Sequence, residues 1–111
     1  MTFNQIVTGR FKNFNEGLRK AIEEAREENG HQDGYSGDIQ TCDTPDISRN
    51  HPRYGTKAFW KWEDKQIQIM DKRECMMLEI TGKKAMDLKN RNGYKGCKGI
   101  RSYYIFGWGA C

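Results

Sequence analysis

An alternating apolar pattern opens the chain and predicts a β-strand over residues 2–11. Phe3, Val7 and Phe11 share one parity, and Ile6 takes the other. Successive side chains of a strand point to opposite faces of a sheet, so this spacing gives the strand one predominantly apolar face.

The pattern then changes to helical spacing and predicts a helix that ends before Gly30. Its apolar positions recur every three or four residues and include Phe14, Leu18 and Ile22. Asn13 followed by Glu16 has the spacing of a capping box, which marks the start of a helix.

Further turns, strands and one more helix are expected along the rest of the chain. Residues 35–41 read as a second strand, and residues 43–55, which hold both prolines, as a long irregular connection. Thr56 is positioned to cap a helix that continues to about Lys72. Strands are expected over residues 75–81 and from residue 100 onward, separated by a Gly- and Lys-rich loop over residues 82–99.

This order of elements predicts a single α+β domain over residues 1–111. Its strands and helices alternate as β-α-β-α-β-β, and the last two strands are expected to be antiparallel. We therefore expect one mainly antiparallel sheet of about four strands with two helices on one face.

Charge is distributed unevenly over the 111 residues, whose formal net charge is +4. Residues 12–46 carry a net charge of −5, with nine acidic and four basic side chains. Residues 83–101 carry +6, because Asp87 is their sole acidic residue. The seven basic residues of that segment are Lys83, Lys84, Lys89, Arg91, Lys95, Lys98 and Arg101. The segment is predicted to contact a polyanion or an acidic protein surface, or to form a solvated loop.

Aromatic residues give a second candidate binding surface. Trp60 and Trp62 lie among lysines at 57 and 61 and point about 200° apart on a helix, so one of them should be buried and the other partly exposed. The C-terminal strand places Tyr104, Phe106 and Trp108 on one face. These three, with Trp60 and Tyr94, are candidate partner-binding residues; the alternative is a central strand buried on both faces.

The four cysteines, Cys42, Cys75, Cys97 and Cys111, include no C-x-x-C pair. Structural zinc sites draw their ligands from short spacings, so neither a metal site nor a cofactor is predicted. The N-terminus lacks the apolar core of a signal peptide, which favours a cytoplasmic protein with reduced thiols. Cys97 lies among basic residues and is expected to be the most reactive thiol.

Enzymatic motifs are weak in this sequence. The turn from His31 to Asp38 combines a base, carboxylates, a hydroxyl and glycines, but it has neither the spacing of a P-loop nor that of a dinucleotide-binding loop. His31 and His51 are candidates for a catalytic pair, and Ser36 for a nucleophile, although none of them lies in a catalytic motif. A small enzyme or nucleotide-binding protein is therefore an alternative to a binding protein.

Four sequence strings together resemble those of small proteins encoded by bacteriophages and related mobile elements. They are VTGRF, DGYSGDI, GTKAFWKWE and YYIFGWGAC. The resemblance implies a non-enzymatic protein that binds and inhibits or redirects a host macromolecule, such as a component of a defence system, in the host cytoplasm. A nucleic-acid-binding accessory protein that uses residues 83–101 is the second hypothesis. No membrane association is expected, because no run reaches the roughly 20 apolar residues of a membrane span.

Overall fold

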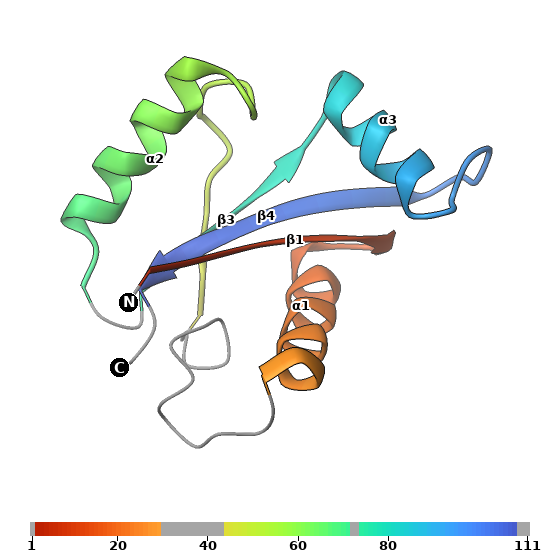
Figure 1. Cartoon of the computed structure of the whole chain (residues 1–111), viewed down its shortest axis with the longest axis horizontal. Helices are drawn as coiled ribbons and strands as arrows, with labels where there is room; N and C mark the ends of the chain where they lie inside the picture. The colour runs from red at the N-terminus through yellow and green to blue at the C-terminus, as the bar shows by residue number, and fades with distance from the viewer. Residues whose placement is uncertain (1, 30–43, 72–73, 109–111) are drawn as a thin grey trace.

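A computed structural model describes the chain apart from residues 1, 30–43, 72–73 and 109–111 (Figure 1). The described residues form one mixed sheet with helices packed against it, which confirms the α+β class. The strands are β1 (Thr2–Arg10), β2 (Asp46–Ile47), β3 (Cys75–Ile80) and β4 (Ile100–Trp108). The helices are α1 (Phe14–Asn29), α2 (Lys57–Ile69) and α3 (Gly82–Arg91).

The strands follow the order β1-β4-β3-β2 across the sheet. β4 pairs antiparallel with both of its neighbours, β1 and β3, whereas β2 pairs parallel with β3. The expected antiparallel pairing of the last two strands is confirmed. Among the described strands, β1 is a long edge strand, and β4 lies between β1 and β3 from Ser102 to Gly107.

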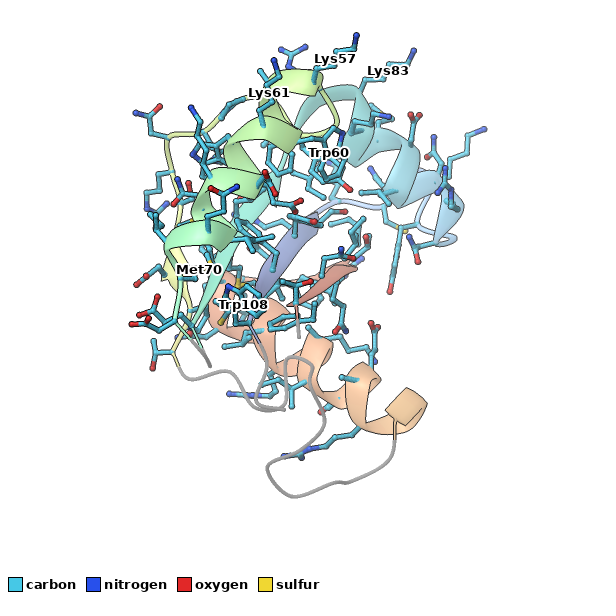
Figure 2. The ribbon with its side chains drawn as sticks, turned by 60° about the vertical axis from the view of Figure 1, so that its left-hand side comes forward. Lys57, Trp60, Lys61, Met70, Lys83 and Trp108 are labelled. Atoms are coloured by element: carbon cyan, nitrogen blue, oxygen red, sulfur yellow. The ribbon has the colours of Figure 1, made fainter. Side chains whose placement is uncertain are left out.

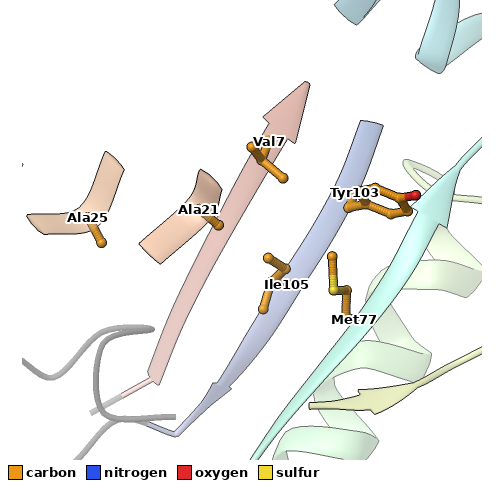
Figure 3. Packing of buried hydrophobic residues seen from close by; sticks show 6 residues of the cluster. All are labelled: Val7, Ala21, Ala25, Met77, Tyr103 and Ile105. Atoms are coloured by element: carbon orange, nitrogen blue, oxygen red, sulfur yellow. The ribbon is translucent and has the colours of Figure 1, made fainter. Parts of the chain in front are cut away.

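Helices cover both faces of the sheet, which corrects the expectation of helices on one face. β3 and β4 are apolar at both parities, and from Ser102 to Gly107 every residue of β4 is buried. A strand that is apolar on both sides needs cover on both sides. On one face, the core between the sheet and α1 contains Val7, Ala21, Ala25, Met77, Tyr103 and Ile105 (Figure 3). On the other face, the core between the sheet and the helices α2 and α3 contains Phe59, Leu78, Ile80, Tyr104 and Phe106.

Part of the predicted basic loop is a helix. α3 begins directly after β3, and its residues Ala85 and Leu88 pack against the core on the α2 side. Two apolar contacts three residues apart form a stripe too narrow to stand out among lysines. Among the other residues of α3, the lysines, Met86 and Arg91 are strong helix formers, and these residues were the helix signal available in the sequence.

The structure contains a short strand where an irregular connection was expected, and it does not test the strand predicted before it. Residues 35–41 lie outside the described residues, whereas β2 falls within the connection that was expected to be irregular. A strand of two residues is too short to show alternation, and its pairing with Met76 and Met77 depends on where β3 lies. Such a strand can be identified only from the tertiary structure.

Both predicted helix starts are confirmed. Asn13 Oδ1 accepts a hydrogen bond from the Glu16 amide at 3.1 Å, and Glu16 in turn accepts one from the Lys12 amide. Thr56 Oγ1 accepts a hydrogen bond from the Phe59 amide at 3.2 Å. These side chains satisfy amides that have no partner within the helix.

Candidate basic and aromatic binding face

The basic residues of segment 83–101 lie on three elements. Lys83, Lys84, Lys89 and Arg91 belong to α3, Lys95 and Lys98 to the following loop, and Arg101 to β4. Within the described part of the chain, Arg101 alone of these seven forms an ion pair, with Glu79 at 3.9 Å. The other six carry positive charge that no described carboxylate neutralises at contact distance.

The first turn of α3 has the opposite charge from the one that a helix start favours. Lys83 and Lys84 occupy this turn, which contains no acidic residue, and the side chain of Thr81 forms no capping hydrogen bond. The free amides of a helix start already carry partial positive charge, so lysines there are unfavourable unless an anion is near.

The start of α2 also lacks an acidic residue, although Thr56 caps it. Its first turn begins with Lys57 and has no acidic residue. Figures 1 and 2 both place the starts of α2 and α3 at the same end of the molecule, and Lys57, Lys61 and Lys83 extend from that end (Figure 2). Two helix starts and their lysines therefore concentrate positive charge in one region.

Trp60 lies next to these lysines and is accessible from solvent. Its side chain is 43% exposed, and its ring is held from behind by edge-on contacts with Tyr54 and Phe59, with centroids at 5.6 and 5.1 Å. Trp62 is instead half-buried against Phe59, so the two tryptophans differ in exposure as their spacing predicted, but neither is fully buried. Trp60 thus offers a supported aromatic surface.

Tyr54 and Lys84 connect the two helices. The methylene stem of Lys84 extends over Gly55, next to Tyr54 in the chain. Both side chains line a small pocket of about 160 Å³ beside β1, together with Arg91 of α3. We call Tyr54, Lys57, Trp60, Lys61, Lys83 and Lys84 the basic–aromatic face. Sequence reasoning missed Tyr54, whose one signal was its place just before the Gly55–Thr56 helix start.

Of the predicted aromatic contact residues on β4, two are buried and the third is half-buried. Tyr104 and Phe106 are buried, and the Tyr104 hydroxyl donates a hydrogen bond to Glu63. Burial, and then this hydrogen bond, raise the pKa of the Tyr104 hydroxyl. Trp108 is half-buried and donates its Nε1–H to the Ile67 carbonyl at 2.7 Å. Tyr104 and Phe106 are therefore core residues under α2 in this structure, and a docking role for the partly exposed Trp108 stays a prediction.

The loop after α3 is built from short turns. Tyr94 is half-buried, and its amide donates to the Lys89 carbonyl at 3.0 Å, while its own carbonyl accepts from the Cys97 amide at 2.9 Å. Lys95 and Lys98 are exposed in this loop, at the far end of α3 from its first turn. They are thus separated from Trp60 by the length of the helix.

The cysteines differ from the expectation of four reduced thiols. Cys75 is buried at the start of β3 and is disulfide-bonded. Cys97 is a free, half-buried cysteine. A buried cysteine in a strand is typical of an apolar core position, so sequence alone gave no reason to expect its oxidation.

The enzyme hypothesis rests on His51 within the described residues, because the His31–Asp38 turn lies outside them. His51 Nδ1 lies 3.2 Å from Ser48 Oγ, and the imidazole packs against Trp62 at 5.6 Å. Burial lowers the pKa of His51. The histidine and Ser48 line a pocket of about 310 Å³ whose other residues include Arg49 and Glu79. A hydrogen bond between residues three apart in a loop is an ordinary loop contact and does not by itself indicate catalysis.

The fold and the face together define the chain as an α+β protein with a basic and aromatic surface formed by the starts of two helices. No protein-family model, curated protein or solved structure matches it. None of the helices in the described ranges combines the length and apolar character needed to cross a membrane.

Proposed function

We propose that this chain is a non-enzymatic binding protein whose basic–aromatic face binds single-stranded nucleic acid. One observation carries the proposal: a supported, exposed Trp60 ring lies beside lysines at two helix starts that lack any acidic residue in their first turns. Proteins that bind single strands combine stacking rings with a positively charged track for the backbone.

Each part of the face has a chemical role in this proposal. The ring of Trp60 stacks on an unpaired base, and Tyr54 and Phe59 keep the ring from turning away. Lys57, Lys61 and Lys83 contact phosphate oxygens, which also neutralise the unfavourable charge at the helix starts. Base identity is not read by these groups, so binding should be weakly dependent on sequence.

A host protein is the second candidate partner, and it is the one that the resemblance to phage proteins implies. The structure gives it less support. Tyr104 and Phe106 of β4, which would anchor a protein interface, are covered by α2. The cations of the basic–aromatic face are lysines, which are depleted in protein interfaces relative to the rest of the surface. Lysine does bind phosphate, as a point charge.

Titration of a fluorescent oligothymidine against the protein, followed by anisotropy, tests the proposal. Trp60→Ala should weaken binding about 5- to 150-fold, because a stacked base contributes about 1–3 kcal/mol. Neutralising about four phosphates should give a log–log salt slope near −2.8. If the oligonucleotide quenches tryptophan fluorescence in the wild type but not in Trp60→Phe, the base stacks on the Trp60 ring.

Matched charge reversals provide the control. Lys83→Glu with Lys84→Glu should abolish binding, whereas Lys20→Glu with Arg26→Glu, on the opposite side of the sheet, changes net charge equally and should weaken binding far less. Equal losses from both pairs would mean that net charge alone causes binding. Two results together would contradict the proposal and favour a protein partner. The chain would fail to bind the oligonucleotide at low salt, and it would capture from host lysate a protein that survives nuclease treatment and is lost in Trp60→Ala.

A further inference from the structure

β1 is a nine-residue edge strand whose own sequence carries neither proline nor a central charge. Within the part of the chain that the structure describes, it lies at the end of the strand order and pairs only with β4. Its sequence, TFNQIVTGR, has no proline, no lysine and no acidic residue, and its sole charged residue is Arg10 at the end. Edge strands ordinarily carry prolines, bulges or central charges that prevent pairing with another chain.

Ile6 lies at the centre of this strand and is partly exposed. Its side chain is 37% exposed on the face that carries α2 and α3, because Ile6 is opposite Tyr104 in the sheet. It also lines the small pocket beside Tyr54 and α3. A branched apolar residue in the middle of an edge strand favours pairing with another strand, whereas the charged residues usual at this place oppose it.

We infer that a second copy of this chain pairs antiparallel with β1 to form a symmetric dimer. An antiparallel pair of identical strands has a two-fold axis, and the strand's own centre places that axis at Ile6. Ile6 then lies opposite Ile6 of the second copy, a cross-strand apolar pair that favours this register. In the same register Arg10 lies opposite Thr2, so the two arginines are at opposite ends of the interface and do not repel each other.

The dimer goes beyond the proposed function and does not depend on it. Pairing through β1 joins the two sheets edge to edge, with the two-fold axis perpendicular to the sheet. Side chains on one face of the first copy then stay on that face in the second. Both basic–aromatic faces would thus lie on the same side of one continuous sheet. A strand from an unrelated protein is the other possible occupant of this edge, and it would leave the purified chain monomeric.

Sedimentation equilibrium of the full chain without nucleic acid tests the inference. The wild-type protein should show a concentration-dependent monomer–dimer equilibrium, and Ile6→Lys should be monomeric at the same concentrations. Ile69→Lys is the matched control, because Ile69 is a more exposed isoleucine (76%) on α2. It should dimerise like the wild type. A monomeric wild-type protein, or equal dimerisation of both variants, would overturn the inference.

A cross-linking variant keeps the test decisive if Ile6→Lys does not fold. In a Cys97→Ser background, Ile6→Cys should form a disulfide-linked dimer under mild oxidation. Directly paired antiparallel residues have Cα atoms about 4.5–5.5 Å apart, which is within the range of disulfides. Ile69→Cys in the same background should not cross-link. Cross-linking of neither variant, or of both equally, would show that β1 is not the interface.

Discussion

The two faces of the sheet are built on different principles. Against α1 the core is closed by small residues: Ala21 and Ala25 are buried, and Gly17 lies so close to the Tyr103 ring that a methyl group there would overlap it. Against α2 and α3 the core is a group of aromatic rings that continues from buried Phe59 to exposed Trp60. The core on the α1 side is therefore covered by the helix, whereas the aromatic group on the other side includes an exposed ring that is available for binding.

The two faces also differ in the hydrogen bonding of their buried tyrosine hydroxyls. The hydroxyl of Tyr103, on the α1 side, is buried without a hydrogen-bond partner within the described structure. The hydroxyl of its neighbour Tyr104 donates to Glu63 of α2. On the α1 side the polar neighbour of Tyr103 is Arg101, and interaction with the tyrosine raises the pKa of that guanidinium. On the α2 side a hydrogen bond to a carboxylate joins Tyr104 to the helix that carries Trp60.

The largest effect is expected from removing the ring at the centre of the aromatic group. Phe59→Ala should lower the free energy of unfolding by about 3–5 kcal/mol, because Phe59 is fully buried. Phe14→Ala, on the α1 side, should cost less because Phe14 is only partly buried. Urea denaturation measures both. Equal losses would show that the two faces contribute alike.

Loss of the disulfide at Cys75 should have the next largest effect. Cys75→Ser, or reduction of the native protein, should lower the free energy of unfolding by about 2–4 kcal/mol. Cys97→Ser should change it by less than about 0.5 kcal/mol. Thiol titration of the denatured, unreduced protein should give fewer than four thiols. A count of four would restore the reduced state that the sequence suggested.

The paired tyrosines give a smaller and more selective test of the comparison. Tyr104→Phe should cost about 1.5–3 kcal/mol, because it removes a hydrogen bond to a carboxylate. Tyr103→Phe removes a buried hydroxyl without a partner and should leave stability unchanged or slightly higher. Thermal unfolding of the two variants distinguishes them, and the reverse order would contradict the polar difference between the faces.

The smallest effect is expected from pH. Burial lowers the pKa of His51, so the unfolded chain takes up a proton first as pH falls. The contribution of His51 is therefore complete above about pH 6.5 and decreases as pH falls from there toward its lower folded-state pKa. His51→Gln should flatten the stability profile in this range, measured by urea midpoints, and leave oligothymidine binding unchanged. A large loss of binding would instead give His51 a direct role in the site.

Much of the fold could be predicted from sequence because local patterns determine it. The alternation in residues 2–11 and the capping residues Asn13 and Thr56 placed β1, α1 and α2. Because Trp60 and Trp62 point in opposite directions on a helix, the sequence predicted that they differ in solvent exposure, and Trp60 is the more exposed ring. Each of these features depends on neighbours within a few residues.

The remaining features depend on contacts between distant segments. Nothing local shows that α2 covers Tyr104 and Phe106, that Glu63 accepts the Tyr104 hydrogen bond, or that Lys84 reaches Gly55. The sequence by itself determined where charge and aromatic rings occur along the chain. The tertiary structure decided which of them remain at the surface, because burial of a strand with two apolar faces depends on which helices pack against each face.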